Sequence, residues 1–453
     1  MKTEKHPLLE RDYFEKLRTS LLGNLNTSEY LFISLFAEAS HFARITFAKV
    51  RQSGIVHDAI LELTLVLESN NGGLKRASSA ISLRGIQEID IAAAISALKA
   101  LRSEAASLPE DPYAALPKNS GSTENVTTGA LPAAETAIEE LLKPAGALDL
   151  VGIFASGPIV RATANSAGQV HWFYTETFSF DYSIYANERA VKGSYAGKNW
   201  DSQAYAKELE RSKQHLSFLL KPARKLKRGA YRAYLAPSAV AELITMFSWG
   251  TASEAALRQG NSPFRFLRSG DKHLSPLLGL SEDFSGGEVP RFNDNGEIAP
   301  LTLPIISEGR LINTLVNKRT EKEYGVPANG ANEIETLRSP VIGEGTLLEH
   351  EILNMLETGI YISNLHYLNW SDQPNGRITG MTRYACFLVE SGNIVAPIEN
   401  LRFDDTIFDL FGSNLEALTK NRGFIPEVHT YFIRSLGGTM VPGILVSSMK
   451  FTL

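Results

Sequence analysis

The sequence predicts an α+β protein of two domains, an N-terminal antiparallel β-sheet with long helices and a β-rich C-terminal domain with a few helices. Its 453 residues fit two or three domains, at roughly 150 residues each. Before residue 221, segments with strand-like alternation are interleaved with segments of helical apolar spacing. After it, short apolar segments separated by Gly, Pro and Asn dominate, which is typical of a β-rich domain.

The first elements are a helix and a set of strands. Residues 12–25 have apolar side chains at helical spacing. Residues 61–67, LELTLVL, alternate almost strictly, which is the period of a strand. Asn and Gly at 70–73 form a turn signal, and residues 74–85 follow as a partner strand. We therefore expect an antiparallel hairpin or meander.

Helices and strands continue to residue 220. Residues 86–107 are rich in Ala, Leu and Ile without Gly or Pro, which favours a long helix. Residues 108–131 combine prolines with a polar run, which predicts an exposed loop. The remaining elements are expected to be a helix at 133–142, a strand at 148–159, half-buried aromatic strands within 169–187 and a helix at 201–220.

The basic segment KPARKLKRG, residues 221–229, marks the domain boundary. It is short and ends in Gly, and no aromatic residues are interleaved with its charges. Because the net charge is −5, we interpret it as a solvated linker rather than a patch for phosphate or nucleic acid. The expected domains are residues 1–228 and 229–453.

The second domain begins with a strand and a short helix. Residues 231–237 read as a strand, and residues 238–247 as a helix with Ser238 as its N-cap. Further on, CFLVESGNIVAPI predicts a strand, a Ser-Gly turn and a second strand.

Composition excludes several classes of protein. A net charge of −5 and a pI near 6.1 lack the footprint of a dedicated nucleic-acid binder. The lone Cys386 excludes an intrachain disulfide and a Cys-rich zinc site. No stretch of about 18 apolar residues would span a membrane. The first 20 residues lack the apolar core of a secretory signal, so we expect a cytoplasmic protein.

Local motifs for nucleophilic, nucleotide or zinc chemistry are missing. There is no G-x-S-x-G elbow and no phosphate-binding G-x-x-x-x-G-K-[ST] loop. His350-Glu351 has no second ligand one helical turn away, so we expect an amphipathic helix with His350 exposed. Cys386 lies within the apolar run YACFLV, which favours a buried small hydrophobic residue.

One polar, Gly-punctuated stretch, residues 366–405, contains candidate ligand-binding side chains. They could satisfy backbone carbonyls within a turn-rich strand system, or they could line a groove for a peptide. The candidates are Asn369, Arg377, Thr382, Arg383, Asn400 and Arg402.

The same stretch carries a family resemblance. The pattern G-x-x-T-R-x-x-x-F-x-V-E-x-G-x-I-x-x-P-I-x-N-L-R-F, beginning at Gly380, resembles the C-terminal core of the TldD/PmbA family. Flanking segments at 300–332 and 437–453 are similar to those of the family, and the resemblance is loose over residues 1–230. It implies an N-terminal α/β domain, a β-rich C-terminal domain and a dimer that encloses a central cavity.

The resemblance also implies a zinc site that this sequence lacks. Active members resemble zinc peptidases that cleave unfolded peptides. They carry H-E-x-x-x-H on the first helix of the C-terminal domain and a cysteine ligand near the C-terminus. Here the corresponding segment, residues 241–257, contains no His, and Tyr431 or its neighbours stand where active members have the cysteine. All three ligands are missing, which leaves no zinc site of this kind.

We therefore expect no catalytic residue, no metal ligand and no cofactor. The expected protein is a non-catalytic homologue, paired as a homodimer or as a heterodimer with a metal-bearing member, that binds unfolded peptide by strand addition. One alternative is a divergent peptidase whose zinc is held by His350, Glu351 and His366 or His429. The other is a self-contained homodimeric peptide-binding or scaffold protein. Neither nucleic acid nor membrane is an expected partner.

Overall fold

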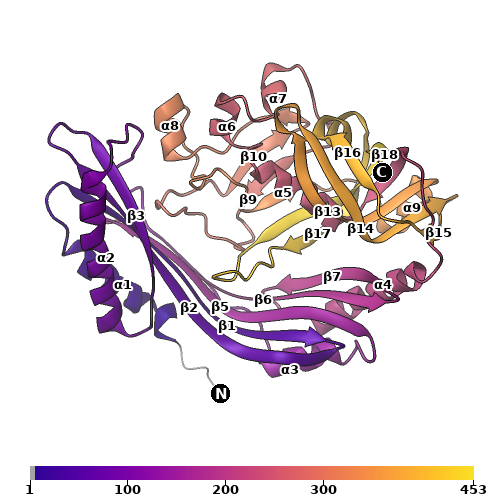
Figure 1. The fold of residues 1–453 in the computed structure, drawn as a ribbon, viewed down its shortest axis with the longest axis horizontal. Coiled ribbons are helices and arrows are strands. Elements are labelled where there is room, and N and C mark those ends of the chain that lie inside the picture. Colours follow the sequence, from indigo (N-terminus) through magenta and orange to yellow (C-terminus); the bar gives the residue numbers. More distant parts are fainter. Residues whose placement is uncertain (1–5, 453) are drawn as a thin grey trace.

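The computed structural model describes residues 6–452 and contains two large sheets. The predicted α+β class is confirmed (Figure 1). The first sheet has seven strands in the order β3-β2-β1-β5-β6-β4, with β7 also paired to β6. Its pairings are antiparallel except β4–β6. The strands are β1 (Glu29–Thr46), β2 (Lys49–Glu68), β3 (Leu74–Ser82), β4 (Thr123–Thr127), β5 (Asp149–Asn165), β6 (Val170–Ala186) and β7 (Arg189–Gly197).

Alternation in the second half of β2 produces one buried and one more exposed face, as the sequence predicts, whereas β1 is buried on both faces over much of its length. Leu35 lies opposite Leu61, and both are buried under α1 (Arg11–Leu22) and α2 (Gln87–Ser107). Each such leucine contributes about 2 kcal/mol by burial. The predicted turn at 70–73 joins β2 to β3, with Gly72 at a φ of +80°. Figure 1 shows both helices on one face of the curved sheet.

The other end of the first sheet is joined to the second half of the chain. Helices α3 (Ala134–Leu142) and α4 (Ser202–Leu219) pack there around the aromatic strands β5 and β6. The carboxylate of Asp201 caps α4 by accepting the N–H groups of Gln203 and Ala204. Phe387, from the second sheet, is fully buried in the same core.

Two strands of this sheet differ from the prediction. Residues 108–131 are not only a loop, because β4 lies within them and pairs in parallel with β6. The aromatic segment 169–187 is one long strand rather than several. Because the residues of β4 are exposed and mostly polar, their sequence does not predict a strand. Pairing with β6 decides the conformation of β4.

The second sheet has eleven strands, ordered β11-β10-β9-β12-β18-β16-β14-β13-β8, with β15 paired to β14 and β17 to β18. It is mixed, since β12–β18 and β13–β8 are parallel. The strands are β8 (Gly229–Leu235), β9 (Leu280–Asp283), β10 (Thr302–Ser307), β11 (Arg310–Leu311), β12 (Pro340–Ile342), β13 (Gly359–Asp372), β14 (Arg377–Glu390), β15 (Asn393–Pro397), β16 (Arg402–Thr406), β17 (Leu415–Pro426) and β18 (Gly438–Phe451).

Short helices accompany this sheet. They are α5 (Pro237–Thr245), α6 (Glu254–Arg258), α7 (Arg265–Ser269), α8 (Lys318–Tyr324) and α9 (Ile352–Leu356). The expected N-cap Ser238 is wrong: Ala236 is the N-cap and Pro237 is the first helical residue, where its missing N–H costs nothing. The Ser-Gly turn between β14 and β15 is confirmed.

No helix within residues 6–452 is long and apolar enough to cross a membrane. Of the N-terminal segment in which no secretory signal is expected, residues 1–5 lie outside the described residues. The domain boundary after residue 228 stays a prediction.

Candidate functional site

The two halves of the chain meet where the β17–β18 loop, residues 427–437, reaches the first sheet. Arg434 in this loop is 4% exposed. Its backbone N–H donates to the Glu38 carboxylate at 3.0 Å. Its guanidinium donates to the carbonyls of Gly157 at 2.6 Å and Thr177 at 3.1 Å. One side chain therefore ties the loop to β1, β5 and β6.

The negative charge of Glu38 stabilises the buried, positively charged Arg434 side chain. Burial lowers the pKa of Arg434 to about 10, and the neighbouring Glu38 carboxylate opposes that change. The guanidinium therefore stays charged at neutral pH. Arg161 adds a second guanidinium, which donates to the Arg434 carbonyl at 3.0 Å. We call Glu38, Arg161 and Arg434 the buried clamp.

The tip of the same loop is exposed. Tyr431 and Phe432 are 82% and 87% exposed. The loop is thus held in place by the buried Arg434, and its tip exposes two aromatic side chains to solvent. This is the segment in which the family resemblance implies a cysteine ligand.

Helix α5 lies close to this loop. Ala241 and Met246 are buried in the apolar core, whereas Glu242 is exposed. The surrounding protein and the Glu427 carboxylate raise the pKa of Glu242, while Lys192 and His429 lower it. Glu242 is therefore the one carboxylate that α5 presents to the seam between the halves.

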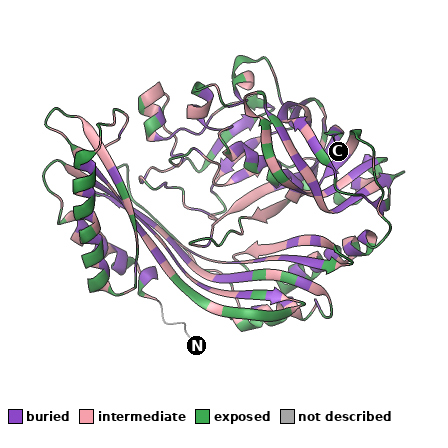
Figure 2. Ribbon diagram, in the orientation of Figure 1, coloured by how far each residue is buried: buried purple, intermediate pink, exposed green. Residues whose placement is uncertain are grey.

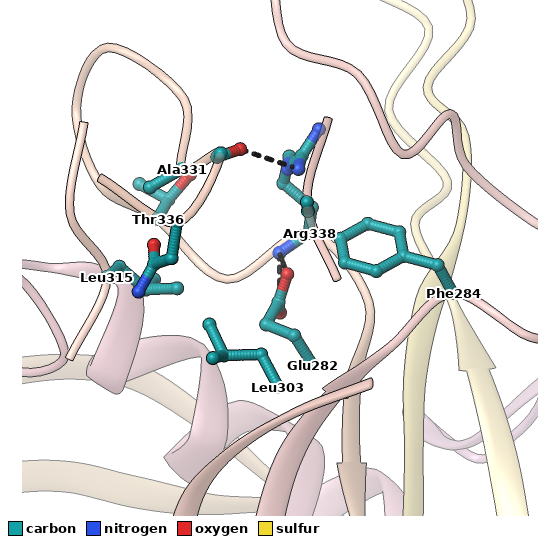
Figure 3. A pocket seen from close by; sticks show the side chains of 10 residues that line it. Glu282, Phe284, Leu303, Leu315, Ala331, Thr336 and Arg338 are labelled. Carbon is teal, nitrogen blue, oxygen red and sulfur yellow. Dashed lines mark hydrogen bonds between the residues drawn. The ribbon is translucent and has the colours of Figure 1, made fainter. Parts of the chain in front are cut away.

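A small cavity of about 10 Å³ lies beside Glu282 and Arg338 (Figure 3). Glu282 is 2% exposed and accepts the backbone N–H groups of Arg338 and Ser339. Burial raises its pKa to about 7. The Arg338 guanidinium donates to the carbonyls of Phe292 and Gly330. A space of one water molecule cannot hold a peptide, so this cluster supports the fold.

A wider, open hollow of about 350 Å³ lies between the halves. An ion pair between Arg76 and Glu333, at 2.8 Å, crosses it. Its volume is in the range of ligand sites, and its walls combine charged side chains with the apolar Leu108 and Pro109. It is lined by Arg76, Ser78, Leu108, Pro109, Asp111 and Glu333.

Three of the predicted ligand-groove residues share one outer region of the second sheet. Asn369 on β13 lies opposite Thr379 on β14. The Arg377 guanidinium pairs with the Asp404 carboxylate. Arg402 donates to the Thr379 hydroxyl at 3.2 Å. Their observed contacts are with neighbouring strands.

The other three predicted residues are dispersed. Thr382 is 1% exposed, and its hydroxyl accepts the Leu401 N–H at 2.9 Å. The Arg383 guanidinium lies over the Tyr384 ring at 5.2 Å. Asn400 is exposed between β15 and β16. The structure therefore does not gather all six residues around one groove. A role for any of them in ligand binding stays a prediction.

Cys386 is buried, and burial raises the pKa of its thiol to about 11. At neutral pH it is a thiol rather than a nucleophilic thiolate. The interpretation as a small buried hydrophobic residue is confirmed.

Residues 228–453 match the family model of the PmbA/TldA metallopeptidase C-terminal domain. The chain belongs to the TldD/PmbA family. No protein in the comparison with curated proteins matches the sequence.

Solved structures with the same fold match nearly the whole length of this chain. A proposed modulator of a DNA gyrase from Thermotoga maritima has a TM-score of 0.74 at 14% identity, over 97% of this chain and 100% of that one. TldE from Thermococcus kodakarensis has a TM-score of 0.73 at 15% identity, again over 97% and 100%. A proposed modulator of DNA gyrase from Bacteroides thetaiotaomicron has 0.72 at 15% identity, over 98% of each chain.

The zinc site implied by the family does not fit the side chains present. When the sequence is aligned to H-E-x-x-x-H, helix α5 and its C-cap Met246 supply A-E-x-x-x-M, with Ala241 and Met246 in the two histidine positions. Neither side chain is a zinc ligand of this kind, and both are buried in the apolar core. Within residues 6–452, no three His, Cys, Asp or Glu side chains gather closely enough to hold a metal ion.

The alternative ligands lie on separate elements of the family fold. His350 lies in a short 3-10 turn, His366 on β13 and His429 in the β17–β18 loop. His350 is exposed, as predicted from the amphipathic pattern. The sequence analysis missed Glu242, although Ala241-Glu242 aligns with the first two positions of H-E-x-x-x-H and could have indicated it. It also missed the buried clamp, which no local pattern indicates.

Proposed function

We propose that this chain is a non-catalytic TldD/PmbA family member that forms one wall of a peptide-binding chamber, together with a second subunit. The observation that carries this proposal is the donor set of α5, where Ala241 and Met246 replace the two histidines of the active pattern. Without these ligands no water can be activated by zinc at this place.

Two features support a peptide as the ligand. The hollow between the halves carries charged groups of both signs, Arg76, Asp111 and Glu333, whose present ion pairs can be exchanged for pairs with peptide termini and side chains. Long strands with free edges bind extended peptides through backbone hydrogen bonds, largely independently of side-chain identity. The cytoplasm is the proposed location.

The first experiment is a measurement of zinc in the purified, untagged chain by elemental mass spectrometry after dialysis against metal-free buffer. The proposal expects zinc far below one ion per chain, and no change in peptide binding after chelation. One tightly held zinc per chain would overturn it. In that case His350, His366 and His429 would be replaced first.

A second experiment tests the partner. The chain is co-expressed with a family member from the same host that carries H-E-x-x-x-H, and complexes are isolated through the partner's tag. Co-purification in a defined ratio supports a chamber of two different subunits. Absence of any complex would overturn this version and favour a self-contained binding or scaffold protein.

A further inference from the structure

Strand β3 is the last strand of the first sheet, and its outer side has no strand partner within residues 6–452. Two hydrogen bonds show how its backbone groups are oriented. The Leu83 N–H donates to the Ala59 carbonyl of β2 at 2.9 Å, and the Leu74 carbonyl accepts the Asp111 N–H from the outer side at 2.7 Å. Since these directions alternate along a strand, the even-numbered residues of β3 face outward. Within the described chain, the outward backbone groups without a hydrogen-bond partner belong to Arg76, Ser78, Ala80 and Ser82.

This edge is accessible along most of its length. Ala77 is the one buried residue among the nine of β3, and the others are half-buried or exposed. Figure 2 shows this strand mostly in the colours of intermediate and exposed residues. The strand contains no proline, so every outward position has an N–H to donate. An open edge of this kind binds an extended peptide through backbone hydrogen bonds.

The open hollow between the halves lies at the start of this edge, since Arg76 and Ser78 belong to both. Beyond the hollow the edge is closed, because the Leu74 carbonyl is already bonded to Asp111. An added strand must therefore end or turn away at the hollow, which favours the terminus of a peptide there. Leu108, which also lines the hollow, gives the last side chain of such a peptide an apolar surface to contact.

Strand direction and charge select the same terminus. Antiparallel pairing is the more common and more stable arrangement, and β3 already pairs with β2 in this way. The C-terminus of a peptide added antiparallel to β3 lies at the start of β3, next to Arg76. Its carboxylate can accept hydrogen bonds from an outward backbone N–H and from the Arg76 guanidinium. A parallel peptide would bring its N-terminal ammonium group to this guanidinium, and the like charges would repel.

The carboxylates at the hollow are already paired. Asp111 pairs with Arg319 at 2.6 Å, and Glu333 pairs with Arg76 at 2.8 Å. The Glu333 side chain is 62% exposed, and an ion pair this exposed contributes little to stability. A peptide carboxylate can therefore replace Glu333 at small cost. The present pair also shows that the Arg76 guanidinium is oriented into the hollow to bind a carboxylate.

We propose that the outer edge of β3, residues 76–82, binds an extended peptide in the antiparallel direction, with the C-terminal carboxylate of the peptide held by Arg76 in the hollow. This inference deepens the proposed function, on which it rests for a peptide as the ligand, because it names the strand that binds and the end that is recognised. Backbone hydrogen bonds and one carboxylate leave most side chains of the peptide free to vary.

Fluorescence anisotropy with the full chain tests the recognition of the carboxylate. The probe is a heptapeptide of serine, threonine and valine, with fluorescein on its N-terminus and a free C-terminus. We expect the same peptide with a C-terminal amide to bind about tenfold more weakly, because a charge-assisted hydrogen bond is lost. Arg76→Gln is expected to abolish this difference. Arg51→Gln, at an exposed arginine on β2, is the matched control and is expected to retain it.

Glu333→Gln is expected to have the opposite effect. It frees the Arg76 guanidinium from its present partner, so the free-carboxylate probe should bind about two- to fivefold more tightly. A variant that only disturbed the fold would not strengthen binding. Circular dichroism confirms that each variant is folded.

N-methylated probes test the strand pairing. In a peptide paired as proposed, the N–H of the third residue from the C-terminus faces β3, and that of the second residue faces away. N-methylation of the third residue is expected to weaken binding about tenfold, because it removes a hydrogen bond and adds a clash. N-methylation of the second residue is expected to leave binding unchanged.

Three results would overturn this inference and leave the proposed function standing. They are equal binding of the acid and the amide, an acid–amide difference that Arg76→Gln retains, and equal weakening by both N-methyl groups. A probe that binds in neither form would overturn this inference together with the peptide part of the proposed function. The zinc measurement tests the lack of catalysis separately.

Discussion

At the residue scale, Glu254 is a carboxylate that stays charged at 1% exposure. Burial alone would raise its pKa, but hydrogen bonds from Arg268, Thr314 and Arg258 outweigh that effect and lower it to about 2. The Arg258 and Thr314 contacts are 2.7 Å and 2.6 Å long. The ionised form of Glu254 is therefore a stabilising element of the second half.

Replacing this carboxylate tests that role. Because the folded pKa lies below the unfolded value of 4.5, the stabilisation is present above pH 4.5 and is lost as the pH falls toward 2. We expect Glu254→Gln to lose about 3 kcal/mol of unfolding free energy at pH 7, measured by urea denaturation. Glu416→Gln, which breaks the more exposed pair with Arg232, is expected to cost less than about 1 kcal/mol.

Glu282 has the opposite pH dependence. Burial raises its pKa from 4.5 to about 7, so the folded protein holds a proton that the unfolded chain has released between these values. Stability is therefore expected to fall as the pH rises from 4.5 to 7, by up to about 3 kcal/mol. Glu282→Gln should flatten this slope. Urea midpoints at pH 5 and pH 7 measure it, and an equal slope in both proteins would contradict the assignment.

At the scale of the element, β5 depends on a glycine where it crosses β1. Gly157 has a φ of +137°, and a Cβ there would lie 2.2 Å from the Ala39 carbonyl oxygen. The Gly157 carbonyl also accepts a hydrogen bond from Arg434. The backbone must therefore approach β1 closely at the point where the β17–β18 loop docks.

A single methyl group tests this close approach. Gly157→Ala is expected to destabilise the protein by about 2–4 kcal/mol, because both the dihedral angle and the contact are unfavourable. Gly343→Ala is the control, since nothing lies within 4 Å of its added Cβ. Thermal unfolding of both variants gives the comparison, and equal melting temperatures would refute the argument.

Elements with strong local signals were predictable, and those that depend on neighbours were not. The long helix α2 and the β2–β3 turn follow from composition and from Asn and Gly, and both are confirmed. For β4 the sequence predicts a loop, because its exposed, polar residues become a strand only through pairing with β6. The candidate site shows the same division. Glu242 occupies the Glu position of the H-E-x-x-x-H spacing, so a local motif indicates it. Its neighbour Glu427 is 185 positions away, and no local pattern brings the two together.

At the scale of the whole molecule, the buried clamp couples the two halves. Arg434 and Glu38 are 396 positions apart, and both are almost completely buried. Removing one charge of such a pair leaves the other uncompensated, which is more costly than removing both.

We expect Arg434→Met to lose about 3–5 kcal/mol of unfolding free energy. The double variant Arg434→Met/Glu38→Gln is expected to recover part of this loss, because it no longer buries the uncompensated negative charge of Glu38. Urea denaturation followed by far-ultraviolet circular dichroism measures these two variants, the single variant Glu38→Gln and the wild type. A double variant as unstable as the sum of the single ones would show that the two residues act independently.

The sequence by itself determined the α+β class, the alternation that buries one face of β2 in its second half, the family, and the lack of zinc ligands in α5. These are local properties, since periodicity and motif spacing are read within one segment. Only the tertiary structure decided that Arg434 meets Glu38, that Glu242 lies near Glu427, and that no strand within residues 6–452 pairs with the outer edge of residues 49–58. Contacts between distant segments depend on how the sheets curve and pack. The spacing of residues along the chain does not predict these contacts.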